Sequence, residues 1–385
     1  MKILFIIPSI TNYYTFLEDI ARELQERGNE VFLASSTKHI SQIDCYDREV
    51  FGELVEVDFP RGFEWNKHLS SAKRLREIVN EIKPDLINVH FSAAMFTTAI
   101  AKEPSWPRTV AMIHGLAYPI LKGWRKLAIG SAERWAAGKM DQIILLNESD
   151  RQVLSGHVDS SRIKVLESFG LGCDLEKFNL DVIPQEEQIR YHRRLGVRDG
   201  DFVFIFVGRQ VDFKGFDKLI RAFLQLYEDH KNLKLILVGA KDRIHPTNLT
   251  PEEEEQMRRC PGIVNVGWKE NVYHYLCVAD VNVFPSEREG MPVNLMESLA
   301  MGVPVITTDS RGCNEVVEHG LNGLVMKANT VEEIRDNMDR LYQEPDLLNK
   351  LKQGALDNRH HFDRTRFIEE MLEIFESDLA TSPSS

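Results

Sequence analysis

The chain carries one pattern twice: a short apolar run of strand length, followed by a longer segment with apolar residues at helical spacing. In the first series, residues 2–7 (KILFII) precede residues 13–28 (YYTFLEDIARELQERG), where a glycine ends the helical pattern. The apolar residues of this segment share one helical face: Phe16, Leu17, Ile20, Ala21 and Leu24. Further short β-branched runs follow as far as residues 142–147. This alternation is typical of a parallel sheet wound by crossover helices.

A second series begins at residues 201–209 (DFVFIFVGR) and ends at residues 323–327 (GLVMK). Between the two series, residues 176–198 are polar and have no clear strand pattern, so we expect the interdomain linker there. The sequence therefore predicts an α/β chain of two doubly wound, Rossmann-like domains, residues 1–178 and 196–361. Ligands of such sheets bind outside the carboxyl ends of the strands, so two sheets facing each other would enclose a cleft.

Composition restricts where such a protein can work. No apolar stretch approaches the roughly 18 residues of a membrane span, so we expect any membrane contact to be peripheral. The five cysteines form no C-x-x-C pair and no metal-ligand spacing, which favours a reducing, cytoplasmic compartment. The net charge is −12, but residues 1–180 hold 22 Lys and Arg against 24 Asp and Glu. This near-neutral half is the better candidate to meet an anionic surface, and nothing indicates a nucleic-acid partner.

Two glutamates eight positions apart flank a predicted helix start in residues 287–309 (EREGMPVNLMESLAMGVPVITTD). Pro292 suits the first helical position, because its missing N–H is no loss there. Glu289 would then precede the helix, and Glu297 would lie inside it. Carboxylates there can accept hydrogen bonds from sugar or ribose hydroxyls, and the free N–H groups of the helix start favour an anion. The alternative is that Glu289 is a helix cap and Glu297 a solvated surface residue.

A pair of cations follows the first strand of the second series. Arg209 comes directly after this strand, and Lys214 stands just before the next predicted helix, with Gly208 and Gly215 flanking the loop. Both side chains could reach a phosphate above the helix N-terminus, Arg209 as a planar fork and Lys214 as a point charge. The alternative is a pair of solvated surface cations. Together with the two carboxylates, the loop predicts a nucleotide-sugar site.

Three segments resemble the retaining glycosyltransferases of family 4, which have the GT-B fold of two domains. The segments are FVGRQVDFKGFDKLIRAF, VFPSEREGMPVNLMESLAMGVPVITTDSRGCNEVVEHGLNGLVM and FGLGCDLEKF. The resemblance implies transfer of a hexose or N-acetylhexosamine from a nucleotide sugar, with UDP favoured over GDP. It also implies a glycan or polyprenyl-diphosphate-linked acceptor, in the assembly of a polysaccharide, an O antigen or a glycoprotein glycan.

The same resemblance assigns roles to individual residues. Arg209 and Lys214 would hold the donor diphosphate, and Glu297 would bind the ribose hydroxyls. The donor sugar would contact Glu289 and the backbone of Gly290, Met291, Pro292 and Val293. The base pocket would be lined by Val238, Gly239 and the loop from Trp268 to Val272. The last helix, residues 362–380, would complete the first domain.

In the first domain, the candidate acceptor or cleft residues are Asn12, His90 and His114. Many relatives have paired glycines after the first strand, whereas this chain has PSITNYYTF, which leaves Asn12 and Thr11 as the contacts from that loop. His114 ends a strand where relatives present a residue to the donor sugar, and His90 has a similar position. The alternative is that both histidines are structural, with Ser92 capping the helix after His90.

The resemblance also implies a mechanism without a metal or another cofactor. Arg209, Lys214 and the helix N-terminus would balance the charge that develops on the departing diphosphate. The diphosphate itself would help to deprotonate the acceptor hydroxyl, so that the sugar is transferred with retention of configuration. We expect the catalytic residues to be Glu289, His114, Arg209 and Lys214. The D-x-D spacing at residues 199–201 precedes a strand, so we do not expect it to bind a metal.

Tryptophans alternate with basic residues in two segments of the first domain, residues 61–76 and 121–139. Such a surface suits the headgroup level of an anionic membrane, so the protein could bind the inner face of the cell membrane peripherally. The alternative is a solvated helix face with tryptophans in the core. Two other functions also remain open: a UDP-sugar 2-epimerase of similar architecture, and a non-catalytic nucleotide-sugar-binding protein.

Overall fold

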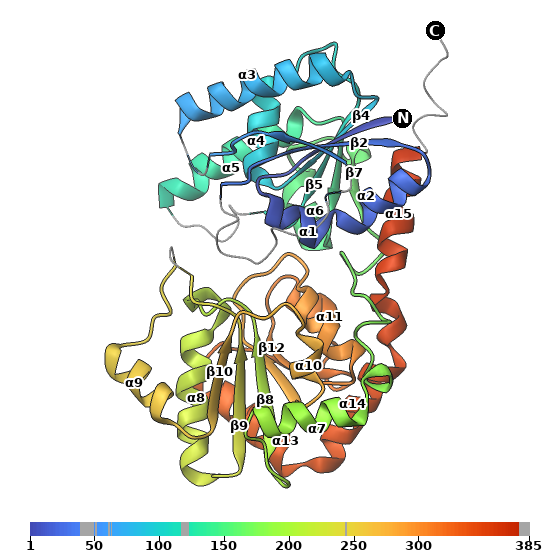
Figure 1. Ribbon diagram of the computed structural model, residues 1–385. Coiled ribbons are helices and arrows are strands. Elements are labelled where there is room, and N and C mark those ends of the chain that lie inside the picture. The colour runs from blue at the N-terminus through green and yellow to red at the C-terminus, as the bar shows by residue number, and fades with distance from the viewer. Residues whose placement is uncertain are drawn as a thin grey trace. The chain divides into compact units, whose positions relative to one another are not determined.

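The computed structural model describes residues 1–38, 50, 52–60, 62, 64–116, 123–242 and 245–376. The chain divides into two compact units, Met1–Gly170 with Arg366–Ser385, and Leu171–Thr365 (Figure 1). Each unit has its own parallel sheet with helices on both of its faces, so the prediction of two Rossmann-like α/β units is confirmed.

The first unit is built on a parallel sheet of seven strands in the order β3-β2-β1-β4-β5-β6-β7. The strands are β1 Lys2–Ile6, β2 Glu30–Ser35, β3 Glu53–Glu56, β4 Leu86–His90, β5 Thr109–Ile113, β6 Gln142–Leu145 and β7 Ile163–Val165. The central strands β4 and β5 are buried along their whole length, which explains their nearly continuous apolar sequences. The edge strand β3 instead exposes Glu53 and Glu56, and charges of this kind discourage pairing with another chain.

The helices of the first unit cover both faces of this sheet. They are α1 Ile10–Phe16, α2 Glu18–Glu26, α3 Trp65–Ile82, α4 Ser92–Ala101, α5 Gly123–Gly138, α6 Glu148–Ser155, the 3-10 helix η3 Ser160–Arg162 and, from Arg366 onward, α15 Arg364–Glu376. In α15, the Phe375 ring packs against Phe5 of β1 with centroids 6.2 Å apart. Its Glu370 accepts a hydrogen bond from the Ser168 backbone N–H at 3.1 Å.

The helix expected over residues 13–28 is divided into α1 and α2. Leu17 lies between them with φ −126° and ψ −18°, outside the helical region. Because Glu18 and Asp19 stand in the first turn of α2, they interact favourably with the new helix N-terminus. The apolar spacing continues across this break, so the pattern alone did not reveal it.

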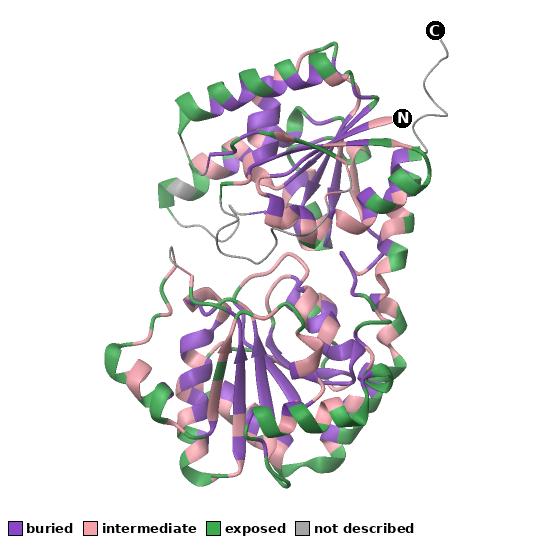
Figure 2. Cartoon of the chain, viewed as in Figure 1, coloured by how far each residue is buried: buried purple, intermediate pink, exposed green. Residues whose placement is uncertain are grey.

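The second unit has a parallel sheet of six strands in the order β10-β9-β8-β11-β12-β13. The strands are β8 Phe202–Val207, β9 Leu233–Val238, β10 Ile263–Gly267, β11 Val281–Phe284, β12 Val305–Thr308 and β13 Gly323–Met326. The α-helices are α7 Gln185–Arg194, α8 Phe216–Asp229, α9 Pro251–Arg259, α10 Tyr273–Leu276, α11 Val293–Ala300, α12 Cys313–Val316, α13 Val331–Gln343 and α14 Pro345–Asp357. The 3-10 helices are η4 Leu180–Val182, η5 Asp212–Lys214 and η6 Arg359–Phe362. Figure 2 shows the strands of this sheet largely buried and the outer faces of its helices exposed.

The segment predicted as a linker, residues 176–198, belongs instead to the second unit. It contains α7, whose Tyr191 stacks on His274 of α10 with ring centroids 4.6 Å apart. His274 also lies 2.9 Å from a carboxylate oxygen of Glu187. The first unit accordingly ends at Gly170 rather than at residue 178.

Candidate functional site

In the second unit, the strand order reverses between β8 and β11, which lie side by side at the centre of the sheet. The chain continues from β8 to β9 on one side of this pair and from β11 to β12 on the other, through loops that begin at residues 208–215 and 285–292. In open parallel sheets this switch point is where ligands bind. Both sequence segments that predicted a nucleotide-sugar site therefore belong to one edge of one sheet.

Two glycines allow the loops of this edge to approach each other closely. Gly215 has φ +70°, and a Cβ atom there would lie 2.2 Å from the carbonyl oxygen of Pro285. Gly312 has φ +81°, and a Cβ atom there would lie 2.4 Å from the carbonyl oxygen of Gly290. At both positions, any larger residue would meet rigid backbone and an unfavourable conformation. The glycines thus hold three strand-to-helix loops together around Glu289.

Lys214 and Glu289, from the first and second of these loops, form an ion pair between Nζ and Oε1. The two side chains are 15% and 12% exposed, so the pair is largely removed from water. The hydroxyl of Ser286 lies 2.5 Å from the same carboxylate oxygen. The backbone N–H of Glu289 donates to the carbonyl of Arg311 at 3.2 Å, which fixes the loop. Each side chain neutralises the charge of the other, because truncating one partner would leave the remaining charge poorly solvated and unpaired.

Arg209 lies on the same loop as Lys214 but has another partner. Its guanidinium group makes a 2.6 Å ion pair with Asp242, and its side chain is 54% exposed. The Phe213 ring has Arg209 at 5.5 Å and Arg288 at 4.4 Å from its centroid. Two guanidinium groups therefore lie against the ring of Phe213, the residue before Lys214 in the chain. The region can therefore supply several positive charges to an anionic ligand.

Helix α11 begins one residue later than expected. Pro292 has extended backbone angles, φ −79° and ψ 108°, and is the N-cap, so Val293 is the first helical residue. The prediction of Pro292 as the first helical residue is therefore wrong by one position. Among the described residues, the backbone N–H groups of Val293 and Asn294 donate to no acceptor. Unpaired N–H groups are usual in the first turn of a helix. Asn294 ties this turn to the sheet, because its side-chain amide donates to the carbonyl of Val207 at 2.8 Å.

Glu297 lies in the second turn of α11 and is partly buried. Burial raises the pKa of its carboxyl to about 7, although the nearby Arg364 and Lys177 act in the opposite direction. Its environment thus differs from that of a solvated surface glutamate. At neutral pH, protonated and ionised Glu297 are both populated, and the ionised form is the better acceptor for ribose hydroxyls.

We expect the Glu297→Gln variant to change how stability depends on pH. Between the usual glutamate pKa of 4.5 and the folded value of about 7, the folded chain binds more protons at Glu297 than the unfolded chain. Wild-type stability should therefore fall, relative to the variant, as pH rises through this range. Urea unfolding of both proteins from pH 5 to pH 8 measures the difference. Parallel stability curves would show that Glu297 has an ordinary pKa.

The predicted base pocket lies around the loops that follow β9 and β10. The backbone N–H of Gly239 donates to the carbonyl of Gly267 at 2.8 Å, and the Gln210 side chain donates to the carbonyl of Gly239 at 2.8 Å. A Cβ atom at Gly239 would lie 1.9 Å from the carbonyl oxygen of Gly208, which explains the glycine. Trp268 is 44% exposed and offers a flat apolar surface. Val238 ends β9, and Val272 is the N-cap of α10.

In the first unit, His90 ends β4 and His114 directly follows β5. The structure brings the two together, with His90 Nδ1 2.9 Å from His114 Nε2. Asn12 lies in α1, where its backbone N–H donates to the Ser9 hydroxyl at 3.4 Å. Ser92 is not the cap that we considered: it is the first residue of α4, and its hydroxyl donates to Glu133 at 2.5 Å.

Phe91, between β4 and α4, has a backbone conformation that normally requires glycine, with φ +68° and ψ +148°. Its ring stacks on His114 with centroids 4.3 Å apart. We expect Phe91→Gly to be more stable than Phe91→Ala by about 1 kcal/mol or more, because both lack the ring but only glycine relieves the strain. Urea unfolding of the two variants tests this. Equal stabilities would mean that the backbone at residue 91 is unstrained.

Sequence reasoning missed three residues of these sites. Ser286 and Asp242 follow the ends of β11 and β9, which is the only signal that could have selected them. Asn88 is two positions before His90, and this spacing puts both side chains on one face of β4. Over the described residues, no cluster of three or more His, Cys, Asp or Glu could hold a metal ion. No helix in that part of the chain is long and apolar enough to cross a membrane.

Two family models divide the chain almost as the two units do. The model Glycosyltransferase Family 4 matches residues 15–168, and Glycosyl transferases group 1 matches residues 187–357. Together these matches cover most of the chain, which belongs to glycosyltransferase family 4 and has the GT-B fold. The predicted family resemblance is thus confirmed.

Named relatives and solved structures agree with this assignment. The capsular polysaccharide biosynthesis glycosyltransferase CapM of Staphylococcus aureus is 26% identical over 84% of this chain and 83% of its own length. The N,N'-diacetylbacillosaminyl-diphospho-undecaprenol alpha-1,3-N-acetylgalactosaminyltransferase of Campylobacter jejuni is 22% identical over 98% of each chain. The crystal structure of Anabaena HepE in complex with UDP superposes with a TM-score of 0.80 at 18% identity, covering 98% of this chain and 100% of HepE.

Proposed function

We propose that this glycosyltransferase transfers a hexose or N-acetylhexosamine from a UDP-sugar, with retention of configuration, to a glycan or a polyprenyl-diphosphate-linked acceptor. The observation that carries the proposal is the Lys214–Glu289 ion pair at the switch point of the second unit. A cation that can bind diphosphate and a carboxylate that can bind sugar hydroxyls meet there, beside the N-terminus of α11. UDP in the HepE complex and the lipid-linked substrate in the name of the Campylobacter relative support the two substrates.

In this proposal, donor binding separates the Lys214–Glu289 pair. The diphosphate takes the place of the carboxylate next to Lys214, and Glu289 then accepts hydrogen bonds from the sugar. Arg209 and the free N–H groups of α11 add positive charge around the departing diphosphate. Glu297 binds the ribose, and the loops near Gly239 and Trp268 hold the base. The backbone from Gly290 to Val293 contacts the donor sugar. In the first unit, His114 contacts a carbohydrate hydroxyl, and Asn12 binds the acceptor.

The first unit also has a surface suited to an anionic membrane, in which a lipid-linked acceptor would lie. Five large apolar side chains on α3 and α5 are between 45% and 71% exposed: Trp65, Leu69, Trp124, Leu127 and Trp135. Exposed basic side chains share these helices and the turn after α5: Lys67, Lys73, Arg74, Lys126 and Lys139. Arg61 and Lys122, which the sequence placed in the same surface, lie outside the described residues. A mixture of this kind suits an anionic lipid surface.

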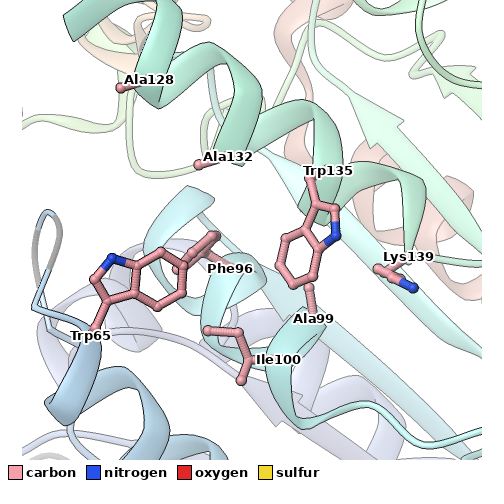
Figure 3. Close-up of a pocket in the computed structure, with 8 residues that line it drawn as sticks. All are labelled: Trp65, Phe96, Ala99, Ile100, Ala128, Ala132, Trp135 and Lys139. Carbon is pink, nitrogen blue, oxygen red and sulfur yellow. The ribbon is translucent and has the colours of Figure 1, made fainter.

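An apolar groove of about 560 Å³ runs between α3, α4 and α5 (Figure 3). The Trp65 and Trp135 rings both pack edge-on against Phe96, with centroids 5.7 and 5.6 Å away, and Lys139 lies at one end. We propose that this groove takes the hydrocarbon chain of an anionic lipid. The basic side chains nearby would attract the charged headgroup, and the groove would shield the chain from water.

Co-sedimentation tests the lipid surface. The full chain should bind phosphatidylglycerol liposomes at low salt and be released at high salt, because the attraction between charges is screened. The double variant Trp65→Ser, Trp135→Ser should bind these liposomes about tenfold more weakly or worse, since it loses two apolar contacts. Val182→Ser is the matched control, because Val182 is 59% exposed but belongs to the second unit. Failure of the wild-type chain to bind at low salt would contradict the proposal.

A panel of nucleotide sugars tests the activity. The purified chain should release nucleotide diphosphate from a UDP-sugar, and release should increase when a polyprenyl-diphosphate-linked sugar is added. The same panel, measured by thermal shift, ranks the donors, because each ligand stabilises the folded chain by mass action. Conversion of the donor sugar into its 2-epimer without an acceptor would instead identify an epimerase. Donor binding without release or epimerisation would identify a binding protein.

A further inference from the structure

Three side chains of the first unit form a hydrogen-bonded series that ends at His114. The Asn88 amide nitrogen donates to the carbonyl of Val110 at 3.1 Å. The Asn88 amide oxygen lies 2.6 Å from His90 Nε2, and His90 Nδ1 lies 2.9 Å from His114 Nε2. Asn88 and His90 are fully buried on β4, whereas His114 is only partly buried.

Hydrogen-bond chemistry allows only one direction along this series. A backbone carbonyl can only accept, so the NH₂ group of Asn88 must face Val110, and its oxygen must face His90. His90 Nε2 must then carry a hydrogen to donate to that oxygen. In a neutral imidazole the other nitrogen is an acceptor, so His90 Nδ1 accepts from an N–H at His114 Nε2.

Both imidazoles are expected to be neutral, because burial lowers the pKa of His90 well below its usual value and that of His114 to about 3. A neutral His114 with hydrogen on Nε2 has a bare lone pair on Nδ1. Among the described residues, this buried nitrogen has no hydrogen-bond partner. The Phe91 and Phe16 rings, with centroids 4.3 and 4.6 Å from that of His114, hold the imidazole in place.

We propose that Asn88 and His90 are positioning residues that fix His114 in the Nε2–H tautomer, so that its Nδ1 accepts a hydrogen bond from a carbohydrate hydroxyl. An unpaired buried acceptor is unfavourable because it has lost its hydrogen bond to water, and a bound hydroxyl would restore a hydrogen bond. Since Nδ1 is shielded in the structure, the hydroxyl reaches it when the side chains around this partly exposed ring move. The carbohydrate part of the inference rests on the proposed function, whereas the tautomer does not.

The tautomer can be observed directly by long-range ¹H–¹⁵N NMR of chain labelled with ¹⁵N-histidine. We expect His114, assigned by its loss in His114→Asn, to show a protonated Nε2 and an unprotonated Nδ1 at neutral pH. His68 is an internal control, because its Nε2 lies 2.9 Å from the carbonyl of Gly62 and must also be protonated. A protonated Nδ1 at His114 in the wild-type chain would overturn the inference, whether or not the protein transfers a sugar.

Two variants test the role of the series. His90→Phe keeps an aromatic ring but cannot accept from His114, so the Nδ1–H tautomer of His114 should become populated. Sugar transfer should then fall at least about tenfold, because a hydrogen on His114 Nδ1 prevents this nitrogen from accepting a hydrogen bond from the carbohydrate hydroxyl. Asn88→Asp replaces the donor to the Val110 carbonyl with a carboxylate, which favours a protonated His90. His90 Nδ1–H would then donate to His114 Nε2, so the Nδ1–H tautomer of His114 should become populated in this variant too. An unchanged tautomer in His90→Phe, with the His68 signals intact, would contradict the positioning role.

Substitutions of His114 test the lone pair itself. Asparagine can place its amide oxygen near the position of Nδ1, whereas alanine offers no acceptor. We therefore expect His114→Asn to retain at least about tenfold more transfer activity than His114→Ala. Equal losses of transfer activity in His114→Asn and His114→Ala would show that no hydroxyl donates to His114 Nδ1. Absence of transfer in the wild-type chain would contradict the proposed function and leave the NMR result to decide the tautomer.

Discussion

Lys214→Ala should reduce sugar transfer about 10²- to 10³-fold, because a fixed cation beside a departing diphosphate contributes about 3–4 kcal/mol to transition-state stabilisation. In the free chain the same change leaves the Glu289 carboxylate largely buried, with the Ser286 hydroxyl as its one close side-chain partner among the described residues. We therefore also expect a loss of about 1–3 kcal/mol in the free energy of unfolding. Initial rates of nucleotide diphosphate release and urea unfolding measure the two effects.

The matched control for this variant is Lys218→Ala. Lys218 is one turn further along the chain and forms a 2.8 Å ion pair with Glu287, on the same loop as Glu289. Glu287 is 51% exposed, so this pair should contribute little to stability or to transfer. UDP should also raise the melting temperature of Lys214→Ala less than that of the wild-type chain. If Lys214→Ala and Lys218→Ala lost the same activity, Lys214 would have no special role at the diphosphate.

The fold was predictable because both sheets are parallel and covered on both faces. Strands such as β5 and β8 must then be apolar along their whole length, so each is visible as an uninterrupted run. The bounds of the strands in the second sheet were therefore predicted to within a few residues. The helix α7 was not found, because Tyr191 is its only buried residue and its other positions are mostly charged. An isolated aromatic residue gives no helical period to detect.

Which loops share a site could also be predicted, since β8 and β11 are neighbours at the switch point. The pairing of individual side chains could not. Asp242, which holds Arg209, comes from the loop after β9, and its distance from Arg209 depends on the path of that loop. Likewise, Lys214 meets Glu289 because Gly215 lets the backbone of one loop touch the other at Pro285. Such contacts depend on the backbone conformation of loops, and the sequence of a loop has no periodic pattern that would predict this conformation.

Glu289→Gln should separate sugar transfer from diphosphate binding. Glutamine keeps the length of the side chain but loses the charge, so hydrogen bonds to the sugar weaken, and transfer should fall by about 10²- to 10³-fold. In contrast, this variant has no Lys214–Glu289 ion pair that must break before Lys214 binds the diphosphate. UDP should therefore bind at least as tightly as to the wild-type chain and give an equal or larger rise in melting temperature. This is the opposite of the change expected for Lys214→Ala.

The control for Glu289→Gln is Glu287→Gln, two positions earlier on the same loop, where the carboxylate is exposed and paired with Lys218. This variant should keep wild-type transfer and wild-type UDP binding. Isothermal titration with UDP and initial rates with the best donor of the panel give both quantities for each variant. Weaker UDP binding in Glu289→Gln would show that Glu289 supports Lys214 rather than competes with the diphosphate for it. Wild-type turnover in that variant would remove Glu289 from the donor site, because a residue that holds the transferred sugar cannot lose its charge without slowing transfer.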